Sequence, residues 1–164
     1  MTAERGTELW TAAAASPIAL LASVPYEHLV SAVEDCPADS EAAFGTNAVD
    51  ALVNLTGRLK DGVCPVLIYA SMAPEPGAPR VTWRGVFTSH VGGRAGLYRG
   101  TACRPPSTAT DGKWDTFWTM RHLARLAPGQ ARLVASLKGW QKKSFYAPDF
   151  VPHGPVLIHN PGPI

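Results

Sequence analysis

The sequence predicts an α+β protein in which a small, strongly bent or barrel-like mixed sheet is flanked by short helices. Two observations lead to this class. Strand-like runs cluster in the middle of the chain, and stretches with apolar residues at helical spacing lie on both sides of that cluster. The length of 164 residues suits one compact domain, which would bury roughly 70% of its unfolded surface. We therefore expect residues 1–164 to form a single domain.

The first third of the chain contains one ambiguous segment and two predicted helices. Leu9–Ser16 is either a strand or a helical turn, and Pro17 ends it because proline cannot continue regular structure. Tyr26–Asp35 has apolar residues at helical spacing and is predicted to be a helix. A polar, irregular stretch follows, and Thr46–Lys60 again has the pattern of an amphipathic helix.

Two strand-like runs in the middle of the chain predict a pair of neighbouring antiparallel strands. Val63–Ser71 is almost entirely apolar, and Val81–Val91 is rich in residues that favour strands. The loop between them, Met72–Arg80, is rich in proline and glycine, which break regular structure. In the second run, alternation predicts that the odd-numbered residues share one face and that the even-numbered residues share the other, toward solvent or an anion.

The second half of the chain continues with strands and one further helix. Ala95–Cys103 is predicted to be a third strand, and a loop follows it. Trp114–Ala127 fits both a helical and an alternating pattern, and we favour a strand for its first half. Ala131–Trp140 is predicted to be a short helix, and Gly154–His159 a last strand.

The charge is nearly balanced overall but unevenly distributed. The formal net charge is +2, which is too small to prove a nucleic-acid partner. However, the segment from Arg80 to Lys143 contains twelve lysine or arginine residues and only two acidic residues, Asp111 and Asp115. The second half of the chain can therefore contact an anion.

The cysteines and the hydropathy predict a cytoplasmic protein without a membrane partner. Cys36, Cys64 and Cys103 are odd in number and widely spaced, which indicates neither a disulfide framework nor a thiolate zinc site. Reduced thiols in a reducing cytosol are the simpler interpretation. No apolar run approaches the roughly 20 residues that a membrane span requires.

Known catalytic motifs are absent from the sequence. It contains no G-x-S-x-G elbow, no glycine-rich phosphate loop followed by Lys-Ser/Thr, and no H-E-x-x-H. We therefore expect a binding module without cofactor or metal rather than an enzyme. An enzyme of unknown reaction that uses His90, His122 or Asp115 remains the alternative.

Aromatic residues lie close to cationic residues in the second half of the chain. The aromatic residues concerned are Trp83, Phe87, Tyr98, Trp114, Phe117 and Trp118. Flat side chains near cations suit the stacking recognition of a base, which is worth about 1–3 kcal/mol per base. Core packing explains the same residues equally well, because each aromatic side chain buries a large area.

The order of these features resembles the EVE branch of the PUA-like superfamily. The resemblance includes a Trp-containing opening segment (ELWTAAAAS), an L-K-D-G turn after a helix, a strand that ends in Tyr69-Ala70-Ser71, a proline-rich loop, and a strand of the type V-x-W-x-G-V-F-T-S. These motifs are short, and the chain departs from the family pattern because Gly62 follows Asp61 and because Pro65 interrupts the strand. The resemblance implies a small bent barrel with a pocket for a modified or flipped-out base of DNA or RNA.

The resemblance and the cation pattern name the candidate residues of such a pocket. By position, the candidates for binding the base are Trp10, Ser16, Tyr69, Ser71, Trp83 and Trp118. The candidates for contacting phosphates are Arg84, Arg99, Arg104 and Arg121. A third hypothesis is an interaction module whose pocket takes a small apolar ligand or a protein segment.

Overall fold

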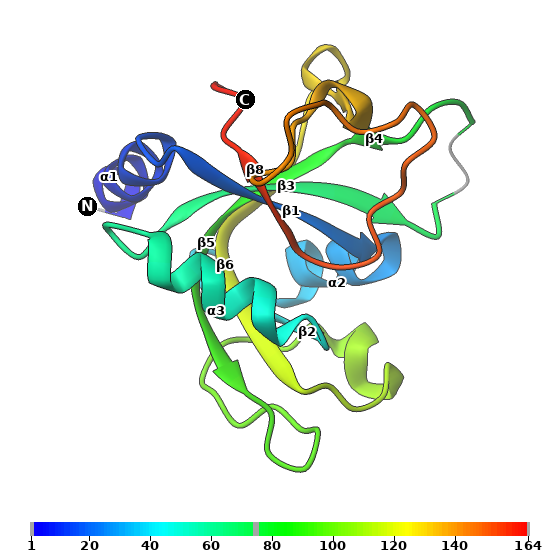
Figure 1. The fold of residues 1–164 in the computed structure, drawn as a ribbon. Helices are drawn as coiled ribbons and strands as arrows, with labels where there is room; N and C mark the ends of the chain where they lie inside the picture. The colour runs from blue at the N-terminus through cyan, green and yellow to red at the C-terminus, as the bar shows by residue number, and fades with distance from the viewer. Residues whose placement is uncertain (1, 74–75, 164) are drawn as a thin grey trace.

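The computed structural model describes residues 2–73 and 76–163 and has an α+β fold (Figure 1). The α-helices of the described residues are α1 (Thr2–Ala14), α2 (Tyr26–Asp35) and α3 (Val49–Arg58). The strands are β1 (Ile18–Pro25), β2 (Ala42–Thr46), β3 (Cys64–Ser71), β4 (Arg80–Val81), β5 (Trp83–Gly92), β6 (Thr116–Arg125), β7 (Arg132–Leu133) and β8 (Val156–His159). Short 3₁₀ helices are η1 (Pro106–Thr110), η2 (Pro128–Gln130) and η3 (Val134–Ser136). None of the helices within the described residues has both the length and the hydropathy needed to cross a membrane.

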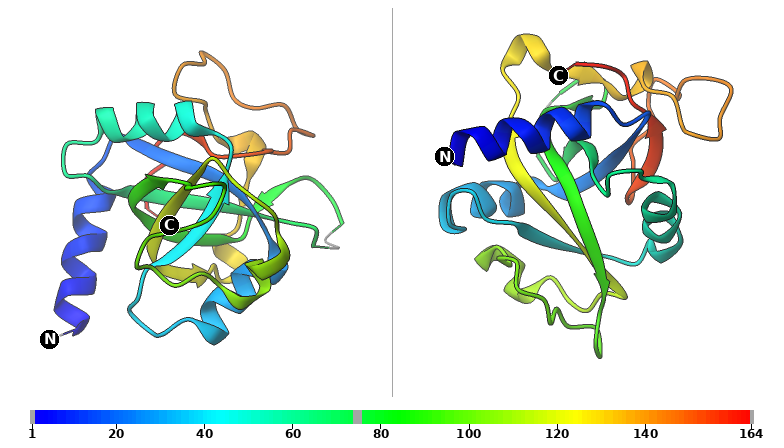
Figure 2. Two further views of the ribbon diagram at one scale, coloured as in Figure 1. Left: turned by 90° about the horizontal axis from the view of Figure 1, so that it is seen from below. Right: turned by 90° about the vertical axis from the view of Figure 1, so that its left-hand side faces the viewer.

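Six strands form one mixed sheet in the order β2-β6-β5-β3-β1-β8. β1 and β3 are parallel, and the other neighbouring strands are antiparallel. The sheet curls into a half-barrel, and α1 crosses its outer side next to β3 and β5 (Figure 2). β4 and β7 form a separate two-stranded ribbon. The predicted fold class, a small bent mixed sheet flanked by helices, is confirmed.

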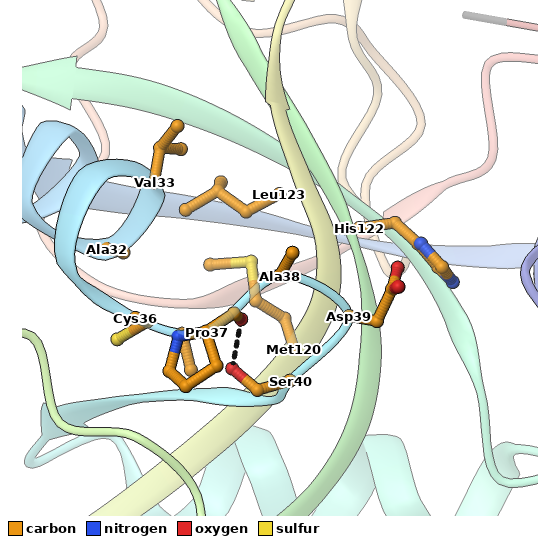
Figure 3. A pocket seen from close by; sticks show the side chains of 11 residues that line it. Ala32, Val33, Cys36, Pro37, Ala38, Asp39, Ser40, Met120, His122 and Leu123 are labelled. Atoms are coloured by element: carbon orange, nitrogen blue, oxygen red, sulfur yellow. Dashed lines mark hydrogen bonds between the residues drawn. The ribbon is translucent and has the colours of Figure 1, made fainter. Parts of the chain in front are cut away.

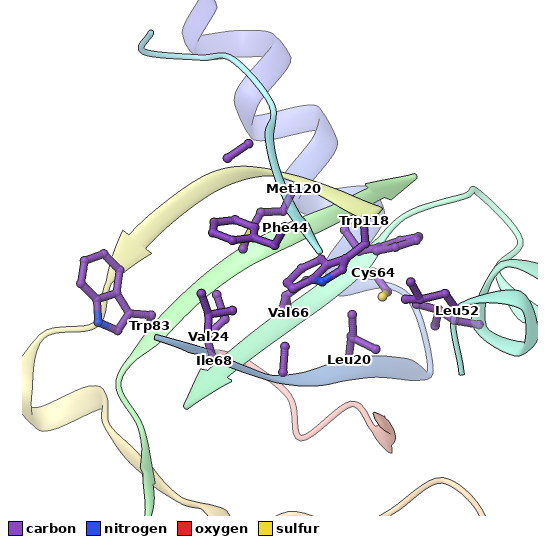
Figure 4. Packing of buried hydrophobic residues seen from close by; sticks show 14 of the residues in the cluster. Leu20, Val24, Phe44, Leu52, Cys64, Val66, Ile68, Trp83, Trp118 and Met120 are labelled. Carbon is purple, nitrogen blue, oxygen red and sulfur yellow. The ribbon is translucent and has the colours of Figure 1, made fainter. Parts of the chain in front are cut away.

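The core consists of two clusters, one on each face of the sheet. The first lies between the sheet and the helices α2 and α3, and it includes Trp83 and Trp118 (Figure 4). The second lies between the opposite face and the C-terminal segment, and it includes Leu21 and Ile158. β1 contributes alternate residues to both clusters, for example Leu20 to the first and Leu21 to the second. A strand buried on both faces is almost entirely apolar, which explains the run IALLASV, in which Ser23 is the one polar residue.

Several predicted elements are confirmed with small shifts at their ends. The structure contains the predicted helix Tyr26–Asp35 as α2, the core of the second predicted helix as α3, and the last predicted strand as β8. β3 and β5 are antiparallel neighbours, with Cys64 opposite Phe87 and Ile68 opposite Trp83. The strand that was favoured for the first half of Trp114–Ala127 is β6, which continues to Arg125.

The predicted alternation along Val81–Val91 is wrong in part. Val81 belongs to the second core cluster and Trp83 to the first, although both positions are odd-numbered. The strand breaks between them at Thr82, whose N–H donates to the carbonyl of Ile68 at 3.1 Å. Irregularities in the β5–β6 pairing, one of which lies between Arg84 and Val86, shift the alternation further, as β-bulges do. Val86 is therefore fully buried instead of facing solvent or an anion.

The elements near the N-terminus differ from the prediction. Leu9–Ser16 is helical for most of its length and forms the last part of α1, so the helical alternative is correct. Two strands were not predicted. β1 follows directly after Pro17, and β2 lies in the stretch that was expected to be irregular.

Two elements in the second half were predicted wrongly. Ala95–Cys103 is not a strand, and only Cys103 joins the sheet, where its backbone bonds to Glu41 and Ala43 beside β2. Ala131–Trp140 is not an α-helix but contains β7 and η3. Two of its N–H groups bond to distant carbonyls, Val134 to Pro79 and Trp140 to Leu157, both at 2.9 Å. The helical spacing of Val134 and Leu137 therefore reflects burial in the second cluster.

A disulfide bond joins Cys36 to Cys103, which corrects the expectation of reduced thiols. Cys36 caps the C-terminus of α2, and Cys103 lies beside β2 across a sequence separation of 67 residues. Linear spacing could not indicate this pair, because the fold alone brings the two positions together. Cys64 is free and buried in β3.

Candidate functional site

A cavity of about 390 Å³ lies where β1 and β3 end, beside β2 and the start of β6. Five parts of the chain that are distant in sequence form its wall. The lining residues are Ser23, Val24, Pro25, His28, Phe44, Gly45, Thr46, Ser71, Met72, Asp111, Trp114, Trp118, His153, Gly154 and Pro155.

The apolar base of this cavity is rigid. Trp118 is 2% exposed, and its ring packs against Phe44 with 5.6 Å between the ring centroids and an interplanar angle of 38°. The two residues are opposite each other in the β2–β6 pairing. Trp118 thus belongs to the core and at the same time lines the cavity.

Trp114 supplies a second indole, and residues outside the two core clusters hold it in place. Its backbone N–H donates to the carbonyl of Gly96 at 3.0 Å, and its ring lies against Gly45 in β2. A Cβ atom added at Gly45 would lie 2.1 Å from Trp114 Cδ1, so only glycine leaves room for this ring position. Trp114 Nε1 is buried and has no hydrogen-bond partner among the described residues. A buried donor without a partner is unfavourable by about 1–3 kcal/mol.

The polar side of the cavity comes from α2 and from the segment around η1. His28 Nδ1 lies 2.7 Å from Ser107 Oγ, and His28 Nε2 lies 3.9 Å from Asp111 Oδ2. Asp111 accepts a hydrogen bond from Arg104 Nη2 at 3.2 Å, and Arg104 Nη1 donates to the carbonyl of Ala43 at 3.0 Å. These contacts fix an imidazole and a carboxylate at the wall with partly exposed polar edges.

The pocket residues predicted from the sequence are divided among different parts of the fold. Ser71 and Trp118 line the cavity. Trp83 is 5% exposed in the first core cluster and makes an edge contact with Tyr26. Tyr69 packs against the second core cluster, which lies on the opposite face of the sheet.

Trp10 and Ser16 lie near α1, away from the cavity. Trp10 is on α1, with the Arg84 guanidinium 4.5 Å from its ring centroid, and it lines a separate cavity of about 160 Å³. Ser16 Oγ donates to the carbonyl of Ile18 at 2.8 Å, at the turn that leads into β1. Both residues therefore fix the junction between α1 and the sheet.

The four predicted phosphate contacts are also in different environments. Arg84 lies over Trp10, and Arg121 donates to the Glu41 carboxylate and to the carbonyl of Asp39. Arg104 holds Asp111 at the cavity wall. Arg99 is exposed on the connection between β5 and β6.

Histidines and acids named in the enzyme alternative do not meet in the cavity. His90 lies on β5, where partial burial lowers the pKa of its imidazole. Asp115 is exposed, with its N–H bonded to Asn47. His122 lines a second cavity, described next.

This second cavity, of about 290 Å³, lies between α2, the loop that follows it and β6 (Figure 3). His122 and Asp39 both line this cavity, and both have positive φ angles, 58° and 62°. Such conformations are uncommon for residues other than glycine. The ring of His122 also packs close to Gly6 of α1, so it contributes to the contact between α1 and β6.

Sequence reasoning missed several residues of the main cavity. Trp114 and Asp111 were noticed in the sequence as an aromatic residue and an acid, but not as pocket residues. No local signal marks His28, Gly45 or His153, because the fold alone brings them to one place. Comparisons of the chain with family models and with curated proteins give no match.

Proposed function

We propose that this protein is a nucleic-acid-binding module that takes a modified or flipped-out base of DNA or RNA into the cavity between Trp114 and Trp118. The observation that carries the proposal is the combination of two indole rings with a fixed polar wall around one space. Its volume of about 390 Å³ lies within the range of small-molecule pockets, about 300–1,000 Å³. The EVE-like motifs in the sequence support the same ligand class.

In this proposal each wall has its own role. Trp114 offers the face of an indole that is only partly buried, and a base would stack on it. Phe44 and Trp118 form the apolar floor, which excludes water. His28 and Asp111 offer hydrogen bonds to the polar edge of the base, the kind of contact by which flipped bases are recognised.

Cations beside the cavity would hold the backbone of the nucleic acid. Arg94, Arg99 and Lys113 are exposed on the β5–β6 connection, which leads directly into Trp114. Exposed cations make favourable contacts with phosphates and position the strand without reading its sequence. Because the net charge is only +2, the affinity should depend on the base as well as on the charge.

A binding titration tests the proposal. Short DNA and RNA oligonucleotides would each carry one altered base, either cytosine methylated on its ring or adenine methylated on its amino group. We expect at least one of them to bind more tightly than its unmodified control, and we expect Trp114→Ala to remove that difference. Equal affinity for all oligonucleotides in wild type and in Trp114→Ala would contradict the proposal.

A second candidate function is hydrolysis, and one contact favours it. Ser107 Oγ lies 2.7 Å from the His28 ring, and a carboxylate lies on the other side of that ring, as in a nucleophile–base–acid set. However, the distance of 3.9 Å between His28 and Asp111 is too long for a hydrogen bond, and Asp111 is already paired with Arg104. Loss of an esterase activity in Ser107→Ala would support this alternative, whereas unchanged base binding in Ser107→Ala would support the first proposal.

A further inference from the structure

A tight hairpin next to the cavity has a fixed shape. The N–H of Arg94 donates to the carbonyl of Leu97 at 3.0 Å, and the N–H of Leu97 donates back to Arg94 at 3.0 Å. The two residues between them, Ala95 and Gly96, have φ angles of 54° and 78°. Positive φ at both central residues defines the two-residue hairpin turn of type I′. The hairpin of residues 93–98, which we call the tip hairpin, is therefore a rigid projection rather than a loose loop.

The tip hairpin is tied to the wall of the cavity. The carbonyl of Gly96 accepts the N–H of Trp114, and the N–H of Gly93 donates to the carbonyl of Asp115 at 2.8 Å. Behind the turn, Tyr98 packs on Phe117 with 5.3 Å between the ring centroids. A base stacked on Trp114 would consequently be held at a fixed distance from the hairpin.

The surface of the tip hairpin combines one apolar side chain with cations. Leu97 is 46% exposed, and Arg94, Arg99 and Lys113 are exposed around it. The segment after β5 projects beyond the rest of the molecule in Figures 1 and 2. A single exposed leucine is common on protein surfaces. Leu97 differs from such a residue, because a rigid turn holds it among cations and beside a pocket that suits a flat ring. This arrangement indicates a role in binding.

We propose that the tip hairpin inserts Leu97 into double-stranded DNA, in the gap left by the base that enters the cavity. The inference rests on the proposed function and specifies a duplex as the partner. Removing a base from a stack costs unpairing and unstacking free energy. An apolar side chain that enters the stack covers the exposed neighbouring bases, as apolar wedges do in DNA-bending proteins. Arg94 and Arg99 would contact the phosphates on either side of the gap.

The experiment compares three DNA probes of one sequence: the single strand, the matched duplex, and a duplex with one central mismatch. The variants are Leu97→Ala and a matched control, Leu133→Ala, which removes the same side chain from a 39% exposed position on β7. We expect Leu97→Ala to bind both duplexes about tenfold more weakly, because one apolar side chain is no longer buried. Its affinity for the single strand should not change, because a single strand offers no gap to fill.

The outcomes separate this inference from the proposed function. If wild type binds the probes and Leu97→Ala binds the duplexes equally well, the insertion of Leu97 (the wedge) is wrong, and the proposed base pocket is not affected. The wedge is also overturned if Leu97→Ala weakens the binding of single strand and duplex alike. If wild type binds none of the probes or the methylated oligonucleotides, the proposed function fails, and the wedge fails with it.

Discussion

Gly45 leaves the space in which the ring of Trp114 lies, so the two residues act as one structural unit. β2 brings Gly45 to the cavity, and the approach is so close that a methyl group would overlap the indole Cδ1. The residue that selects the position of the proposed stacking ring therefore lies 69 positions before it in the sequence and need not contact a ligand.

The first prediction follows from this contact. Gly45→Ala should displace Trp114 and weaken binding of a base by about 1–3 kcal/mol, which is the value of one stacking contact. Gly57→Ala is the matched control, since nothing lies within 4 Å of a Cβ at that position in α3. The control should keep its affinity and should not lose stability, because Gly57 lies in the last turn of α3 and alanine has a higher helix propensity than glycine. Equal affinities of the two variants would show that the ring position does not matter.

A second prediction concerns the tryptophans of the core. Trp83→Ala and Trp118→Ala should each lower the free energy of unfolding by about 3–5 kcal/mol, because both side chains are almost fully buried. Trp83→Ala should not change the affinity of the fraction that remains folded, since Trp83 does not line the cavity. Denaturant unfolding and binding titrations on the same samples check both statements. A loss of affinity in folded Trp83→Ala would restore Trp83 as a pocket residue.

The sequence predicts those parts of the fold where burial follows a simple period. α2, α3 and the β3–β5 pair were found in this way, because one face of each helix and most of β3 are buried. β1 was missed although, like β3, it has residues in both core clusters. Its apolar run has no alternation, and no long loop rich in proline and glycine follows it as one follows β3. Ala131–Trp140 was predicted to be a helix because η3 and β7 place Val134 and Leu137 inward at a spacing that a helix would also give.

The candidate site was harder to predict than the fold. Ser71 and Trp118 were named as pocket residues and line the cavity, whereas Trp10 and Trp83 do not. A pocket is made by residues that meet through the topology, and parallel pairing of β1 with β3 is what brings Pro25 beside Ser71 at the cavity. The disulfide was missed for the same reason.

The third prediction concerns salt. If Arg99 contacts a phosphate, Arg99→Gln should weaken binding to all oligonucleotides alike and make the slope of log affinity against log salt shallower by up to ~1. Arg121→Gln is the comparison, because Arg121 is already engaged by Glu41 and by the carbonyl of Asp39. Titrations at several salt concentrations measure both slopes. A larger change in Arg121→Gln than in Arg99→Gln would contradict the assignment of phosphate contacts to the β5–β6 connection.

The fourth prediction concerns the Cys36–Cys103 disulfide, which closes a loop across 67 residues. In the chain-entropy model, a loop of this length stabilises a protein by about 4 kcal/mol. Reduction, or the variant Cys36→Ser with Cys103→Ser, should lower the free energy of unfolding by a similar amount. Cys64→Ala serves as the control for thiol chemistry. Burial raises the pKa of its thiol to about 12, so Cys64 should stay unreactive in the folded protein. A reductant that leaves the unfolding transition unchanged would show that the bond does not form in solution.

The last prediction concerns acid stability. Burial lowers the pKa of His90 below its usual value of 6.5, because the surrounding protein disfavours the charged imidazolium. The unfolded chain therefore takes up a proton on this side chain at a higher pH than the folded protein does. The contribution of neutral His90 to the free energy of unfolding is fully present above about pH 6.5 and is lost as the pH falls through the folded-state pKa. His90→Gln removes the titrating group, so its free energy of unfolding should decline less between neutral pH and about pH 5 than that of wild type. Parallel pH profiles in wild type and His90→Gln would mean that other groups cause the decline.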